Sequence, residues 1–274
     1  QRHLTIPCEM CIRDRYSDDN KILSAFTETF LLEKSRLMSV GANERTYHIF
    51  YQLFHPGSSN RHAQLRQKLH LGDASQFRIL QDSEGKVMSS GQDELLEELE
   101  SSLLAIGCSP EEIDSLWAVL ASLLHLGNLA CYDSDVKAPV EVDAPETDAA
   151  QSSMQHLDGN VRIHSPTIAL SALAQLLGVT PEMFASRLTT QRVKVSTRRS
   201  VTIKRLNIVD VNNNVAALIK WMYSCLFSWL VSKVNYAHCS VGGDSPSMAS
   251  RRAVKFIGIL DIFGFEILQS NSFE

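Results

Sequence analysis

The fold of this chain is decided by a stretch near its C-terminus that reads Val254-Lys255-Phe256-Ile257-Gly258-Ile259-Leu260-Asp261-Ile262-Phe263-Gly264-Phe265-Glu266. The part before Asp261 is almost continuously apolar and is too short for a typical helix. This pattern predicts a strand that is buried on both faces, inside a sheet covered by helices. We therefore expect an α/β fold in which residues 254–266 form a strand and the loop that follows it.

Asp261 and Gly264 are candidates for a nucleotide site, because ligands of open α/β sheets bind just beyond the carboxyl ends of the strands. A carboxylate there can hold Mg²⁺, directly or through water, and a glycine three residues later allows its N–H to approach a phosphate closely. The pattern D-x-x-G is short and common, so the alternative is a buried strand that ends in an ordinary turn.

The complete hexapeptide Asp261–Glu266, preceded by Phe256–Leu260, resembles switch II of the myosin motor domain. Further stretches are similar to motifs of the same family and occur in the same order. They are Leu31-Leu32-Glu33-Lys34-Ser35-Arg36, Glu44-Arg45 with His48-Ile49-Phe50-Tyr51-Gln52-Leu53, Leu124-His125-Leu126-Gly127-Asn128, and Asn271-Ser272-Phe273-Glu274. The resemblance covers roughly residues 20–274.

This resemblance implies an α/β, mostly helical fold, part of a P-loop-NTPase-type myosin motor: the upper 50-kDa subdomain with strands of the central transducer sheet. It implies a fragment of an actin-based cytoskeletal motor that couples ATP hydrolysis to movement along actin filaments. The expected cofactors are ATP and Mg²⁺, and the expected partners are the actin filament and light chains or calmodulin on the lever. The expected location is the cytoplasm, in the cytoskeleton.

The resemblance also assigns roles to the switch II residues. Asp261 would interact with Mg²⁺ through water, and the backbone N–H of Gly264 would bond the γ-phosphate. Glu266 would pair with an arginine of switch I and help to position the attacking water. Phe263 and Phe265 would fix the loop by packing.

Two motifs of the family do not occur in this sequence: the P-loop pattern G-x-x-x-x-G-K-[ST] and the switch I pattern N-x-x-S-S-R. The resemblance implies that the parent protein is an actin-activated Mg-ATPase. Because the two motifs are absent here, we expect this stretch alone to be inactive. The alternative is a non-catalytic actin-binding tether that retains the motor fold. An unrelated helical scaffold would require all the ordered motif matches to be coincidental.

Composition agrees with a soluble globular class, with 44% hydrophobic and 21% charged residues. The net charge of −5 argues against a general nucleic-acid binder. We find no apolar run that reads as a transmembrane segment, and the first residues do not form a signal peptide. The six cysteines are spread thinly, which predicts reduced thiols rather than a disulfide framework.

Residues 1–18 match nothing in the family pattern, and we expect them to be non-native or disordered. Met10-Cys11-Ile12-Arg13-Asp14-Arg15 looks like translated sequencing adapter. Cys8-x-x-Cys11 would supply only half of a tetrahedral zinc site, and no second pair follows at suitable spacing. Residues 19–274 are then the partial motor domain.

Within that domain the apolar spacing and the capping residues predict the main elements. We expect a surface insertion at residues 133–160, which is acidic and weakly patterned. The other expected elements are a strand at Lys21–Leu32, a short helix at Thr46–Phe54, a helix at Asp93–Ile106, helices opening at Ser109-Pro110, Ser165-Pro166 and Thr180-Pro181, and a long helix at Asp210–Asn235.

Residues 192–206 alternate between apolar and polar side chains, which predicts a β-hairpin with a basic turn. In the myosin family this position looks like the cardiomyopathy loop, which contacts actin. The alternative is a solvated hairpin whose charges keep an exposed edge from pairing. The candidate actin-binding residues are Arg192, Lys194, Arg198, Arg199, Lys204 and Arg205.

Overall fold

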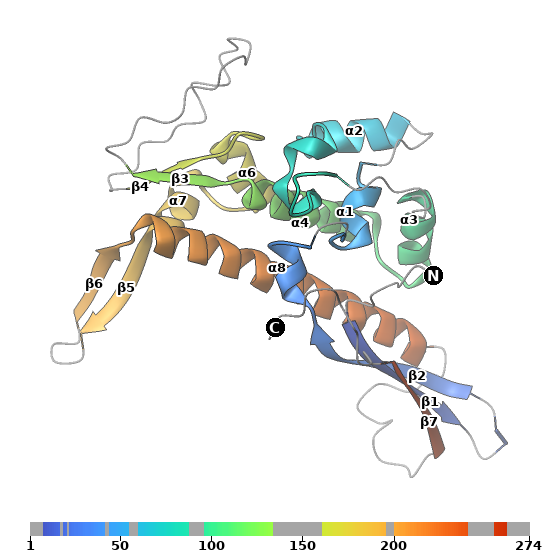
Figure 1. Cartoon of the computed structure of the whole chain (residues 1–274). Coiled ribbons are helices and arrows are strands. Elements are labelled where there is room, and N and C mark those ends of the chain that lie inside the picture. The colour runs from blue at the N-terminus through green and yellow to red at the C-terminus, as the bar shows by residue number, and fades with distance from the viewer. Residues whose placement is uncertain are drawn as a thin grey trace. The chain divides into compact units, whose positions relative to one another are not determined.

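The computed structural model describes residues 8–16, 19–20, 22–41, 44–54, 60–87, 96–133, 161–195, 200–240 and 255–261. The chain forms two compact units, whose helices and strands are labelled in Figure 1. The first unit comprises Gln1–Lys34, Leu103–Cys108 and Ser224–Glu274, and the second comprises Ser35–Ser102 and Ser109–Tyr223.

The first unit contains a three-stranded sheet in the order β2-β1-β7. Its strands are β1 (Cys8–Tyr16), β2 (Ile22–Leu32) and β7 (Lys255–Asp261). The central strand β1 is antiparallel to both neighbours, so β2 and β7 run parallel to each other. The expectation that residues 1–18 are disordered and lie outside the fold is therefore wrong for Cys8–Tyr16, because a strand paired on both sides satisfies its backbone groups within the sheet.

Strand β7 has the predicted strand conformation, but the prediction that it is buried on both faces is wrong. Among the described strands it pairs with β1 alone. Its large apolar side chains are mostly exposed, at 64% for Phe256, 57% for Ile257, 59% for Ile259 and 57% for Leu260. The reason is that the described part of the first unit supplies neither a second neighbouring strand nor a covering layer for these side chains.

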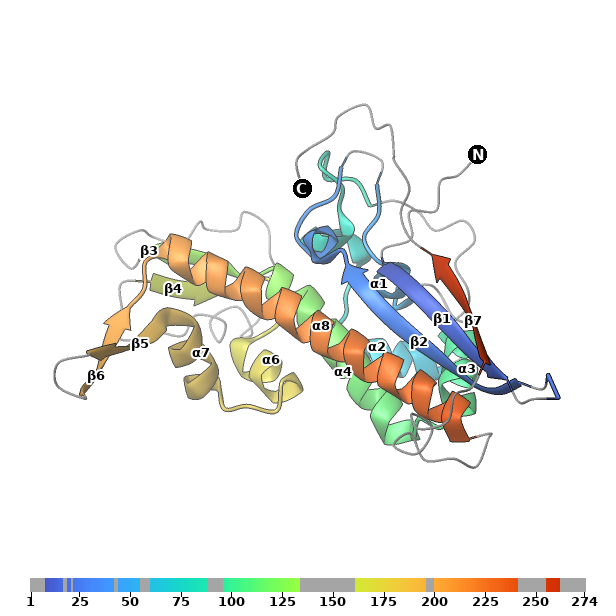
Figure 2. The ribbon, with the colours of Figure 1, turned by 90° about the horizontal axis from the view of Figure 1, so that it is seen from below.

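A long helix, α8 (Ile208–Ser240), has its C-terminal portion in the first unit, where it lies beside β2 (Figure 2). Asn235 on this helix accepts a hydrogen bond from the N–H of Thr27 at 2.7 Å and donates one to the carbonyl of Thr27 at 2.8 Å. Strand β2 lies at the edge of this sheet, where unpaired backbone groups could pair with other chains. The side-chain amide of Asn235 takes the place of a neighbouring strand at one residue of that edge.

By length and composition alone, α8 could also cross a membrane. Between Ile208 and His238 it contains an 18-residue window of mean hydropathy 1.4, of which 17% is buried. This corrects the expectation that no apolar run is long enough to do so. Core helices of soluble proteins meet the same criterion, so the finding is weak evidence for a membrane segment.

The second unit is organised around the helix α4 (Pro110–Gly127), whose Trp117, Leu123, Leu124 and Leu126 are completely buried. The ring of Tyr47, just before α1, stacks on that of Tyr223 in α8 with their centroids 4.5 Å apart. The other helices in the described residues are α1 (His48–Gln52), α2 (Asn60–Lys68), α3 (Leu96–Ala105), α6 (Leu170–Leu176) and α7 (Pro181–Thr189), with short 3-10 turns at Lys34–Leu37, Ala74–Gln76 and Arg78–Leu80.

Helix boundaries with local capping signals are confirmed. Ser109 and Glu112 form a capping box at the start of α4, and the hydroxyl of Thr180 caps α7. The helix expected to open at Ser165-Pro166 instead begins at Leu170, after a bend. The hydroxyl of Thr167 lies 2.9 Å from Nδ1 of His125, and this tertiary hydrogen bond holds the segment outside the helix.

Two antiparallel hairpins complete the described part of the second unit. Strand β3 (Ala130–Asp133) pairs with β4 (Val161–His164), and the expected insertion between them lies outside the described residues. Strand β5 (Thr190–Val195) pairs with β6 (Ser200–Arg205), which confirms the hairpin predicted for residues 192–206. Its turn, residues 196–199, is not described.

We predict that Asn235→Ala destabilises the first unit. The change removes two hydrogen bonds and leaves the N–H and carbonyl of Thr27 without these partners, which costs about 1–3 kcal/mol. Urea unfolding measures the effect. Asn213→Ala is the matched control, because Asn213 is an exposed asparagine on the same helix. Equal unfolding midpoints for both variants would contradict this role of Asn235.

Candidate functional site

The first candidate site is the sheet edge where β2 and β7 end. Because these strands are parallel, their carboxyl ends lie at the same edge of the sheet. Met10 of β1 pairs with Asp261 on one side and with Thr29 on the other. Asp261 therefore lies level with Thr29, near the C-terminal end of β2. Glu33 and Lys34, which follow β2, leave the sheet at this edge. The start of the DIFGFE stretch and part of the LLEKSR stretch, which are far apart in the sequence, therefore lie at the same edge of the sheet.

Asp261 is the last residue of β7, and it is exposed. An exposed carboxylate at a strand end has the chemistry of a Mg²⁺ ligand, either directly or through water, because Mg²⁺ prefers oxygen and retains several waters. Gly264 and Glu266, together with Phe263 and Phe265, lie outside the described residues. The structure therefore positions one of the three predicted switch II residues, and the phosphate and switch I contacts stay predictions.

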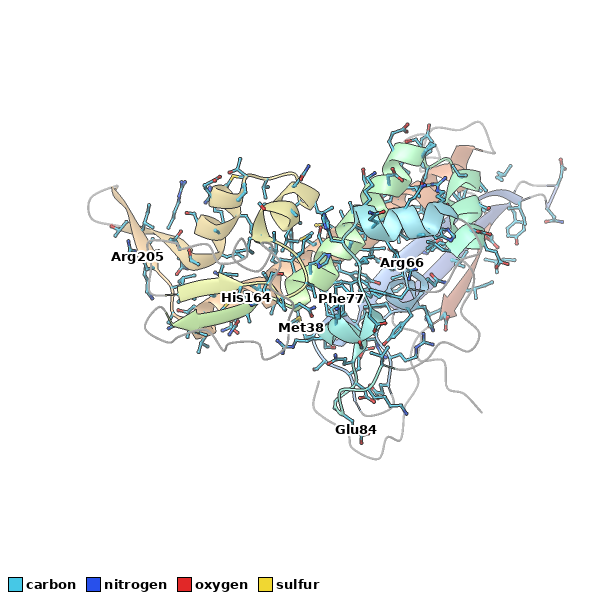
Figure 3. All side chains as sticks on the ribbon, turned by 90° about the horizontal axis from the view of Figure 1, so that it is seen from above. Met38, Arg66, Phe77, Glu84, His164 and Arg205 are labelled. Carbon is cyan, nitrogen blue, oxygen red and sulfur yellow. The ribbon has the colours of Figure 1, made fainter. Side chains whose placement is uncertain are left out.

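The second candidate site is the β5–β6 hairpin of the second unit. Arg192, Lys204 and Arg205 are exposed, and within the described part of the chain none of them forms an ion pair. Figure 3 labels Arg205 on this hairpin. Lys194 is part of β5, whereas Arg198 and Arg199 lie in the turn that is not described. The strands thus present cationic side chains to solvent, as either interpretation of the hairpin requires.

The Leu124–Asn128 stretch has a structural role that the sequence did not reveal. Asn128, which is 3% exposed, accepts a hydrogen bond from the N–H of Arg78 at 2.9 Å and donates one to the carbonyl of Gln76 at 2.5 Å. Gly127 contacts the same segment, because a Cβ added there would lie 2.6 Å from Cδ1 of Ile79. The end of α4 therefore fixes an irregular segment of the chain at a close approach, and a residue larger than glycine at position 127 would require the side chain of Ile79 to shift.

His125 fixes two more segments from the same end of α4. Its Nε2 lies 3.0 Å from the carbonyl oxygen of Leu69 and its Nδ1 lies 2.9 Å from the hydroxyl of Thr167. A carbonyl can only accept, so Nε2 carries the proton and Nδ1 accepts from Thr167. Burial lowers the pKa of His125 from 6.5 to about 4, against the opposing effect of the bond to Leu69. The imidazole is therefore neutral at physiological pH. The feature of the sequence that could have indicated this structural role is a histidine and an asparagine at the end of an otherwise apolar helix.

Comparison with known proteins gives matches to one family. A model of the myosin head (motor domain) matches residues 11–274. The chain is 33% identical over 264 residues to Myosin-1 of Arabidopsis thaliana, a match that covers 96% of this chain and 20% of that protein. It is 31% identical over 261 residues to Myosin-2 of Saccharomyces cerevisiae, which covers 94% of this chain and 14% of that protein.

A human relative agrees with these two. The chain is 32% identical over 259 residues to unconventional myosin-XV of Homo sapiens, and the match covers 92% of this chain and 6% of that protein. The chain thus spans a fifth or less of the length of these curated relatives. The matched region includes most of β1, beginning at Cys11, as well as β7.

We predict that the fold loses stability in acid through His125. Its pKa is lower in the folded state than the ordinary 6.5, so the unfolded state binds the proton more tightly. The contribution of the neutral His125 to the free energy of unfolding is complete above pH 6.5. It is lost as the pH falls from there to about 4, and the loss is roughly 3 kcal/mol, because each unit of pKa shift corresponds to about 1.36 kcal/mol. Urea unfolding between pH 4 and pH 8 measures this loss.

His125→Gln should be less stable at pH 8 but should lack this acid-dependent loss. His48→Gln is the matched control, because His48 is exposed on α1. The assignment to His125 is refuted by a His125→Gln variant that keeps the full pH dependence of the parent chain.

Proposed function

Because the chain belongs to the myosin motor-domain family, we propose that it is part of an actin-based motor that couples ATP hydrolysis to movement along actin filaments. The observation that supports the nucleotide half of this proposal is the shared carboxyl edge of β2 and β7, with Asp261 exposed at that edge. The location that follows is the cytoplasm, on the cytoskeleton.

The sheet geometry supports a place for this chain within a larger, P-loop-NTPase-type motor. We assign β1, β2 and β7 to the central transducer sheet and the helices of the second unit to the upper 50-kDa subdomain. Within the part of the chain that the structure describes, strand β7 pairs on one side only, and its apolar side chains are more than half exposed on both faces. An apolar strand of this kind is stable when further strands and helices cover it, as the central position in a larger sheet would provide.

In the nucleotide site we propose three roles for residues of this chain. Asp261 holds the water shell of Mg²⁺, the backbone N–H of Gly264 donates to the terminal phosphate, and Glu266 orients the attacking water by pairing with a switch I arginine. Mg²⁺ held at this site would neutralise charge on the phosphates of ATP, as an actin-activated Mg-ATPase requires. These groups would act by position and charge.

We further propose that the β5–β6 hairpin contacts the actin filament. Its exposed cations have no acidic partner within the described residues, so they are available to an acidic surface. Light chains or calmodulin would bind the lever of the full-length protein. A non-catalytic tether would retain the hairpin contact and lack ATP turnover, so the two experiments below separate it from a motor.

Gly264→Ala in the full-length motor should slow ATP turnover about tenfold or more, since it impairs a hydrogen bond worth roughly 1.5–3 kcal/mol in the transition state. Nucleotide binding should be largely retained. Steady-state ATPase and nucleotide-binding assays measure the two effects. Gly258→Ala is the control, because its Cβ would meet Sγ of Cys11 at 3.7 Å, an ordinary contact. Unchanged turnover in Gly264→Ala would count against the site, and a wild-type protein that binds actin without turnover would be a tether.

Replacing Arg198 and Arg199 together by Ala should weaken the affinity of the full-length motor for actin about two- to tenfold at low salt. The effect should shrink as salt rises, because exposed charges are screened beyond a Debye length of about 8 Å at physiological ionic strength. Co-sedimentation with filaments across a salt series measures this. Nucleotide binding in the absence of actin is the control. Superimposable binding curves at every salt concentration would leave the hairpin as a solvated edge.

A further inference from the structure

The strand register divides the β5–β6 hairpin into two different faces. Arg192 pairs with Ile203 and Thr190 pairs with Arg205, whereas Val193 pairs with Thr202. Directly paired residues share a face, and successive residues alternate between faces. We name the two sets of strand positions after one member each. The Arg192 face comprises Thr190, Arg192, Lys194, Val201, Ile203 and Arg205, and the Val193 face comprises Gln191, Val193, Val195, Ser200, Thr202 and Lys204.

The two faces differ in charge. The Arg192 face has three of the four cationic positions in the two strands, and the Val193 face has only Lys204. Neither strand contains an acidic residue. An approaching acidic surface therefore meets a stronger field at the Arg192 face, which favours one orientation of the hairpin over the other.

The two apolar side chains that the structure describes on this hairpin differ in exposure. Ile203 is 63% exposed and lies directly across from Arg192, whereas Val193 on the opposite face is 41% exposed. A two-stranded hairpin is marginal in water unless one apolar face is covered. An exposed isoleucine beside cations that form no ion pair with any described residue has the composition of an interface anchor with a charged rim.

We propose that the hairpin binds the filament through the Arg192 face, with Ile203 as the apolar anchor and Arg192 and Arg205 at the rim. The partner surface is acidic and has an apolar depression that receives the isoleucine. The Val193 face stays in solvent, and Lys204 contributes only through its long-range field. This inference rests on the proposed actin contact and specifies which face of the hairpin makes it.

The test compares matched substitutions on the two faces in the full-length motor. Ile203→Thr and Val193→Thr both remove apolar surface, and both keep a β-branched side chain that suits a strand. Arg192→Glu and Lys204→Glu both reverse one exposed charge. Co-sedimentation with actin filaments at low and high salt measures the affinity of each variant, and thermal unfolding measures its stability.

We expect Ile203→Thr to weaken actin binding about fivefold or more at every salt concentration, because a buried anchor does not depend on screening. Val193→Thr should change the affinity less than about twofold. Arg192→Glu should weaken binding at low salt more than Lys204→Glu does, and the difference should narrow at high salt.

Three other results would overturn the proposal, each at a different step. Equal losses for Ile203→Thr and Val193→Thr would retain the hairpin contact and refute its one-sided orientation. A fall in the unfolding temperature of Ile203→Thr with no change in affinity would show that the isoleucine packs inside the motor. If neither these variants nor the Arg198 and Arg199 double variant alters affinity, the proposed actin contact itself fails.

Discussion

The second unit depends on hydrogen bonds made by buried polar side chains at the end of an apolar helix. Backbone groups that lie outside helices and strands must still find partners when they are buried. His125 and Asn128 supply such partners to the segments around Leu69, Gln76 and Arg78. Helix α4 therefore both fills the core and fixes the irregular segments that surround it, which explains why a histidine and an asparagine are found at the end of a leucine-rich helix.

Elements with local signals could be predicted from the sequence, and elements set by distant contacts could not. The caps Ser109 and Thr180 act on donors within the next turn, so their residue types were sufficient. The start of α6 was misplaced because Thr167 is held by His125, 42 residues away. Strand β1 was missed because neither its composition nor its periodicity identifies it, and its pairing with β7 links residues at opposite ends of the chain.

The candidate sites also combine features with a local sequence signal and features that depend on distant contacts. Asp261 was recognised as a strand-end carboxylate, because a short apolar run followed by a charge is a local pattern. That it shares an edge with the residues after β2 follows only from the register, in which Met10 pairs with both Thr29 and Asp261. The basic residues of the hairpin were also recognised, but their division between two faces depends on the pairing of Arg192 with Ile203. Exposure of β7 could not be predicted, since it depends on what covers the strand rather than on its own residues.

The pairing of β3 with β4 has a consequence for the evolution of this chain. Asp133 pairs directly with Val161, so the segment between them begins and ends at adjacent positions. When two ends are fixed side by side, each doubling of the connecting length costs only about 0.6 kcal/mol of closure entropy. Related proteins can thus lengthen, shorten or replace this segment with little effect on the core, and the hairpin is a position where new surface can be added without rebuilding that core.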